Sequence, residues 1–104
     1  MKTKIKTIDI QAKEWFDKVN GNSYFSARVT INFGMKTENT VIVPFQYGYG
    51  DAYCHESFKT LKELKLIAIA GNPTYSAYIH QNKITMRAYI QRDCLKRDVV
   101  NFVK

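Results

Sequence analysis

The sequence predicts one α+β domain over residues 1–104, with elements in the order βββααβα. The expected sheet is an antiparallel meander of about four strands with the helices packed on one face. Apolar and polar residues alternate in 23–33, 40–47 and 84–91, as in strands with one buried face. After Asp51 the apolar spacing becomes helical. A chain of 104 residues with 45% hydrophobic content suits one domain with one modest core.

The first three strands follow one another along the chain. Residues 4–16 form the first, and Asn20-Gly21 then predicts a hairpin, because this pair accepts the positive φ values of a tight turn. Pro44 cannot donate a ladder hydrogen bond, so the third strand should be an edge strand or end its pairing there. The predicted core-facing residues of the second and third strands are Phe25, Ala27, Val29, Ile31 and Phe33, with Val41, Val43, Phe45 and Tyr47.

The second half of the chain mixes helices with one strand. A helix is expected over 52–65, and 66–70 either finishes it or forms a buried strand. A short helix over 74–81 and a strand over 84–91 follow. Asp93 is a candidate N-cap for a terminal helix. Cys54, Phe58 and Leu61 share one stripe of the first helix, and the second helix should turn Tyr75, Tyr78 and Ile79 inward. In the terminal helix Leu95, Val99 and Phe102 keep helical spacing.

The charge of the chain indicates its class of partner. The net charge is +7 and the isoelectric point is about 9.5, a balance that favours DNA, RNA or an acidic protein face. The alternative is a soluble protein with a lysine-rich surface. The basic N-terminal segment has no apolar run behind it, and no stretch is long enough to span a membrane. Cys54 and Cys94 form no CxxC pair, so we expect free thiols, a cytoplasmic protein and no membrane partner.

The stretch "PFQYGYGDAY", residues 44–53, joins the third strand to the first helix. It lacks the third glycine and the parallel βαβ unit of a dinucleotide-binding loop. Asp51, at the cap position, would occupy the free amides and repel an anion. Its rings could instead stack on unpaired bases. We expect Tyr47 and Tyr53 to be core residues and Tyr49 to be exposed.

No catalytic or metal-binding motif is present, so we expect neither enzymatic activity nor a cofactor or metal. The remaining catalytic hypothesis is a cysteine-dependent enzyme in which Cys54 or Cys94 meets His80 in the folded chain. The alternative for these residues is a buried thiol and a surface imidazole.

Two basic surfaces are candidates for binding. The first combines Tyr24 and Arg28 with Arg87 and Tyr89 on the polar side of the sheet, provided that strands 23–33 and 84–91 are neighbours. In chemistry this surface resembles the platform of single-strand RNA binders. The second is the terminal helix, whose alternative role is an exposed helix laced with salt bridges. Its basic residues are Arg92, Lys96 and Arg97.

The segments "KEWFDKVNGNSYFSARV", "VPFQYGYGD" and "CLKRDVV" together resemble small uncharacterised proteins of bacteriophages and gut-bacterial mobile elements. The resemblance covers most of the chain and implies no catalytic or binding residue. It implies only a context, in which small proteins bind and redirect or inhibit host machinery, defence nucleases among it.

The sequence therefore favours a non-enzymatic binding protein that engages a nucleic acid or a nucleoprotein complex, as an accessory or inhibitor. In this hypothesis the arginines and Lys96 contact phosphates, and Tyr24, Tyr49 and Tyr89 stack on bases. The alternative is a protein–protein module, or a homodimer, that uses the tyrosine-rich corner as its anchor.

Overall fold

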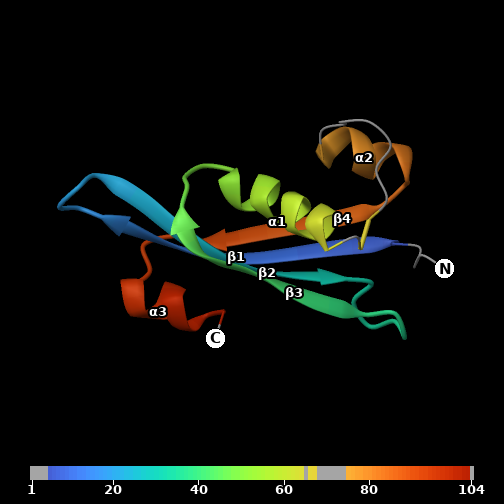
Figure 1. The fold of residues 1–104 in the computed structure, drawn as a ribbon, viewed down its shortest axis with the longest axis horizontal. Coiled ribbons are helices and arrows are strands. Elements are labelled where there is room, and N and C mark those ends of the chain that lie inside the picture. The colour runs from blue at the N-terminus through green and yellow to red at the C-terminus, as the bar shows by residue number, and fades with distance from the viewer. Residues whose placement is uncertain (1–4, 65, 68–74, 104) are drawn as a thin grey trace.

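The computed structural model describes residues 5–64, 66–67 and 75–103 (Figure 1). Within these ranges the chain forms four strands and three helices in the predicted order. The elements are β1 (Thr7–Asp17), β2 (Asn22–Ile31), β3 (Asn39–Tyr47), α1 (Ala52–Glu63), α2 (Tyr75–Gln81), β4 (Thr85–Gln91) and α3 (Lys96–Asn101).

The four strands form one mixed sheet in the order β3-β2-β1-β4. β1, β2 and β3 make the predicted antiparallel meander, and β3 is an edge strand, as Pro44 indicated. The prediction that the whole sheet is antiparallel is wrong, because β4 pairs in parallel with β1. The chain leaves β3, crosses through α1 and α2, and returns beside β1. A crossover of this length is what a parallel pair requires.

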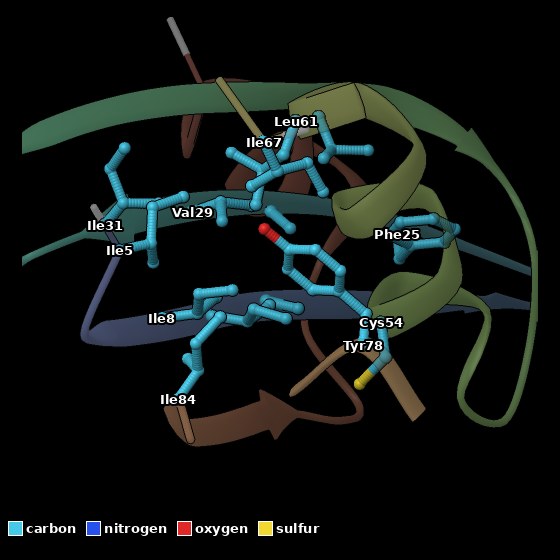
Figure 2. Packing of buried hydrophobic residues seen from close by; sticks show 14 residues of the cluster. Ile5, Ile8, Phe25, Val29, Ile31, Cys54, Leu61, Ile67, Tyr78 and Ile84 are labelled. Carbon is cyan, nitrogen blue, oxygen red and sulfur yellow. The ribbon is translucent and has the colours of Figure 1, made fainter. Parts of the chain in front are cut away.

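One face of the sheet, here called the apolar face, carries the core. Alternate residues of β1 and β2 point into it and pack against α1 and α2. Figure 2 shows side chains from the strands and both helices converging in this single cluster. Its strand members include Ile8, Ile10, Phe25, Ala27, Val29 and Val43, and its helix members include Cys54, Leu61 and Tyr78.

The opposite side of the sheet, here called the polar face, is partly covered by α3. Figure 1 shows α1 and α2 on one side of the sheet and α3 on the other, so the prediction of helices on one face only is wrong. Val99 is the buried residue of α3, and the Ser26 hydroxyl donates a 2.5 Å hydrogen bond to its carbonyl oxygen. Val99 belongs to the set with helical spacing in the sequence, but this spacing does not indicate which face of the sheet the helix covers.

Two connections differ from the sequence-based expectation. Four residues, 18–21, join β1 to β2, and of these only Gly21 has a positive φ. β2 ends at Ile31 because Asn32 adopts a φ of 51°. The Asn32 side chain is buried and accepts a 2.7 Å hydrogen bond from the Lys6 amide. This kink directs Phe33 outward, where 64% of it is exposed, so its predicted core position is wrong.

The helix ends also depart from the predictions. Asp51 precedes α1, but its carboxylate caps no amide and contacts His55 Nε2 at 3.2 Å instead. Leu95, rather than Asp93, is the N-cap residue of α3, because Asp93 has a φ of 59° in the preceding turn. Ile67 is buried in the core. Lys65, residues 68–70 and Thr74, on which parts of the helix predictions depended, lie outside the described residues.

A candidate binding surface on the polar face

The predicted platform residues share the polar face but do not all touch. β1 lies between β2 and β4, so the assumption that these two strands are neighbours is wrong. Gln11 of β1 pairs with Arg28 on one side and Tyr89 on the other. Arg28 and Tyr89 are therefore two strand spacings apart, about 10 Å. A macromolecule could contact both Arg28 and Tyr89 at once, but a single nucleobase could not.

A β-bulge brings aromatic residues of β3 to the polar face. Ala27 pairs with Val43, whereas Phe25 pairs with Gln46, so β3 contains one extra residue between these two pairs. After this point the alternation on β3 is inverted, and Tyr47 pairs with Tyr24 on the polar side. The prediction that Phe45 and Tyr47 face the core with Val43 is wrong for this reason. Pro44, inside the bulge, is a residue type that marks such irregularities.

The result is a contiguous group of rings, here called the aromatic cluster: Trp15, Tyr24, Phe45, Tyr47 and Tyr49. Tyr24 stacks on Trp15 at 5.5 Å and on Phe45 at 5.3 Å between ring centroids. Trp15 and Phe45 also contact each other, with ring centroids 6.4 Å apart, so the three rings form one triangular group. Tyr47 and Tyr49 extend the cluster through edge-on contacts and are 56% and 70% exposed. The inner rings therefore support the cluster, and the outer two present most of its accessible surface.

The corner that carries Tyr49 is held by close packing. Gly48 is buried, and a Cβ atom there would lie 2.6 Å from the Phe25 ring. Gly50 has a φ of 63°, which glycine adopts without strain. Tyr49 is exposed, as predicted, and Tyr53 packs against the core, also as predicted. Burial raises the pKa of Tyr53 to about 12. The expectation of a core position for Tyr47 is contradicted by its exposure.

Three cations of the polar face lie over aromatic rings. Lys96 Nζ is 5.4 Å from the centroid of the Trp15 ring. The Phe102 ring meets two cations, with Lys13 Nζ at 5.0 Å and Arg28 Cζ at 4.5 Å. Such contacts fix the side chains while leaving the cationic groups able to bind anions. Lys13, Arg28 and Lys96, here called the cation group, thus surround the junction of β1, β2 and α3.

Two of the three remaining predicted cations, Arg87 and Arg92, have carboxylate partners. Arg87 forms a paired contact with Asp9, with Nε–Oδ1 at 2.6 Å and Nη2–Oδ2 at 3.1 Å. Arg92 donates a 2.9 Å hydrogen bond to Glu14, which alternation places on the apolar face. These carboxylates neutralise two of the predicted phosphate ligands. Arg97 is exposed on α3, and no ion pair or ring contact holds it within the described part of the chain.

A hollow opens at the other end of the polar face, beyond the cation group. Its volume is about 290 Å³, and the Asp9–Arg87 pair lies in its wall. The exposed Phe33 ring forms one side. The other lining residues are Gln11 and Thr30. The hollow extends the polar face as a groove with both charged and aromatic walls.

The cysteines differ in burial. Cys54 is buried in the core, and desolvation raises the pKa of its thiol, which disfavours the thiolate that a nucleophile needs. Cys94 is partly exposed, and its Sγ lies 3.4 Å from the Gln91 carbonyl oxygen. In the described ranges no three His, Cys, Asp or Glu side chains lie close enough to hold a metal ion.

Sequence reasoning missed four residues of this surface: Lys13, Trp15, Phe45 and Phe102. Trp15 and Lys13 follow the alternation of β1 and were open to prediction once that strand was placed. Phe45 required the bulge, and Phe102 required the face on which α3 packs. Neither of these two features has a local sequence signal strong enough to decide it.

No family model, curated protein or solved structure matches this chain. No helix among the described residues has the length and apolar character needed to cross a membrane.

Proposed function

We propose that this protein binds single-stranded nucleic acid, free or within a nucleoprotein complex, on the polar face of its sheet. The observation that carries the proposal is the position of the cation group beside the aromatic cluster. Lys96 lies over Trp15, and Trp15 stacks on Tyr24 of the same cluster. Proteins that bind single strands combine a cationic groove for the backbone with rings on which bases stack.

The exposure and the partners of each side chain indicate its proposed role. Tyr47 and Tyr49 are the most exposed rings of the cluster and are the proposed stacking platform. Lys13, Arg28, Lys96 and Arg97 are the proposed phosphate contacts, because no carboxylate in the described residues forms a salt bridge with them. Asp17 attracts Lys96 only at longer range. Arg87 and Arg92 are less suited to this role, since Asp9 and Glu14 already hold them. A role as a phage-type accessory or inhibitor of host machinery is the context that we propose for this binding.

Binding of a fluorescent single-stranded oligonucleotide, followed by anisotropy, tests the proposal. Four phosphate contacts predict an affinity loss of about 50-fold when salt rises from about 50 to 200 mM. Tyr47→Ala and Tyr49→Ala should each weaken binding about tenfold, within the range measured for base stacking. Phe16→Ala is the matched control, because this exposed ring alternates with Trp15 and points to the other face. Affinity that is independent of salt and of both tyrosines would contradict the proposal.

A protein–protein role is the second candidate, favoured by a different observation. β3 is an edge strand of nine residues without a charged side chain, and Ile42 on it is 46% exposed. An uncharged edge beside exposed tyrosines is suited to pairing with another chain, although Pro44 interrupts its donors. Light scattering across protein concentrations separates the two candidates. A dimer that Tyr49→Ala dissociates, together with no oligonucleotide binding, would favour this second function.

A further inference from the structure

α3 is attached to the sheet less firmly than α1. α1 buries Cys54, Ser57 and Leu61, whereas α3 buries only Val99. The contact beneath Val99 is polar, since its carbonyl oxygen accepts from the buried Ser26 hydroxyl. The chain before α3 is anchored, because the Cys94 amide donates to the Glu14 carbonyl oxygen at 2.9 Å. An element with few apolar contacts and a fixed preceding segment can open locally without unfolding the domain.

Phe102 occupies a position with the chemistry of a base-binding site. Its ring lies against the Arg28 guanidinium, and Lys13 contacts the same ring. Arginine planes and lysines of this kind hold unpaired nucleobases, with the cations also facing the adjacent phosphate. Arg28 and Lys13 project from the central strands β2 and β1, so the site is built on the rigid part of the sheet.

We propose that Lys13 and Arg28 form a site for one unpaired nucleobase and its phosphate, and that Phe102 fills this site in the free protein. Nucleic acid then displaces Phe102 and releases the end of α3, so the helix acts as an internal competitor. This inference rests on the proposed function and adds a specific site and a conformational step to it.

The competition is energetically accessible. An exposed ring–cation contact changes an equilibrium constant about 2- to 5-fold, so the two contacts of Phe102 favour the closed form by about 5- to 30-fold. The apparent affinity of the free protein is the affinity of the open form multiplied by the fraction of protein that is open. Loss of both Phe102 contacts should therefore raise the apparent affinity by up to about 5- to 30-fold. A base and a phosphate that contact the same cations replace what Phe102 loses.

Oligonucleotide affinity of Phe102 variants provides the test. Phe102→Leu keeps an apolar side chain but removes the ring, and we expect it to bind a single-stranded oligonucleotide about 5- to 30-fold more tightly than wild type. Arg28→Ala should bind at least about fivefold more weakly, because it removes the site itself. Leu95→Ala is the control, since it truncates an exposed side chain of the same segment without a ring or cation contact and should leave affinity unchanged.

A second measurement uses the wild-type chain, in case a variant loses α3 altogether. Hydrogen exchange of the amides at the end of α3, including the Phe102 amide that donates to the Asp98 carbonyl oxygen, should become faster when oligonucleotide is bound, whereas exchange in α1 should not. Phe102→Leu binding that is equal to or weaker than wild type, or α3 amides that become protected, would overturn this inference. If Tyr47→Ala still weakens binding in that case, the proposed function stands. Absence of binding by wild type and by Phe102→Leu would overturn both.

Discussion

The two faces of the sheet are built from the same strands but place their aromatic rings in different surroundings. On β2, Phe25 is buried beneath α1, whereas its neighbour Tyr24 packs with the Trp15 and Phe45 rings on the other side. On the apolar face, contacts between aliphatic and aromatic side chains exclude water and hold the fold together. On the polar face, rings support cations and remain partly exposed. Neighbouring residues of β2 therefore lie in different environments, and we expect stability and the proposed binding to respond to different substitutions.

The largest expected effect is the contrast between Phe25→Ala and Tyr24→Ala. Phe25 is 1% exposed, so its truncation should lower the free energy of unfolding by about 3–5 kcal/mol. Tyr24→Ala should lower the free energy of unfolding by only about 1–2 kcal/mol, through the loss of its stacked ring pairs. It should nevertheless weaken oligonucleotide binding more than Phe25→Ala does. Chemical denaturation and anisotropy measure the two quantities. Equal losses of stability in Phe25→Ala and Tyr24→Ala would contradict the assignment of stability to the apolar face.

One arginine–carboxylate pair lies on each face of the sheet. Glu14 is nearly buried, so Arg92→Ala should leave its charge poorly solvated and cost about 1–3 kcal/mol of stability. Arg87→Ala, on the polar face, should cost about 0–1 kcal/mol because Arg87 is well exposed. Urea unfolding of both variants gives the difference. A larger cost for Arg87→Ala would contradict the assignment of the two faces.

Alkaline pH should weaken the apolar face selectively. Burial raises the pKa of Tyr53 from 10.0 to about 12, so the folded protein keeps the phenol neutral where the unfolded chain ionises it. This stabilising contribution is complete below about pH 10 and is lost as pH rises toward 12. Thermal unfolding across this window should show a falling midpoint, and Tyr53→Phe should make the decline shallower. An unchanged pH slope in this variant would remove the explanation by burial.

The smallest effect concerns the cysteines. Cys94 is partly exposed, whereas Cys54 is buried with a raised thiol pKa. Iodoacetamide should therefore modify Cys94 first in the native protein and Cys54 only after unfolding. Mass spectrometry of the labelled peptides measures the order. Prompt modification of Cys54 in the native state would show that the core near α1 is open.

Much of the fold was predictable because the alternation of apolar and polar residues along a strand can be seen in the sequence of that strand alone. Val29 and Arg28, one residue apart, were placed on opposite faces of β2 from their spacing alone. The parallel partner of β4 was not predictable, since strand pairing is decided by long-range packing. The face of the sheet that α3 covers was also not predictable, because the same helical spacing would bury Val99 against either face.

The candidate site was predicted less completely than the fold. Tyr49 was correctly expected to be exposed, and Arg28 does lie on the polar face. The bulge at Pro44 moved Tyr47 from the expected core to the surface, which one extra residue in a strand is sufficient to do. The carboxylate partners of Arg87 and Arg92 could not be identified from the sequence, because Asp9 and Glu14 are each 78 residues away.

The most direct test of the account is an NMR titration of the labelled protein with a single-stranded oligonucleotide. We predict shifts of amide signals around Lys13, Trp15, Arg28, Tyr47 and Tyr49, with the amides of α3 affected and those of α1 and α2 nearly constant. Each shift should diminish as salt is added, because the contacts are to phosphates. Shifts confined to α1 and α2, or none at a saturating oligonucleotide concentration, would contradict the assignment of the polar face as the binding surface.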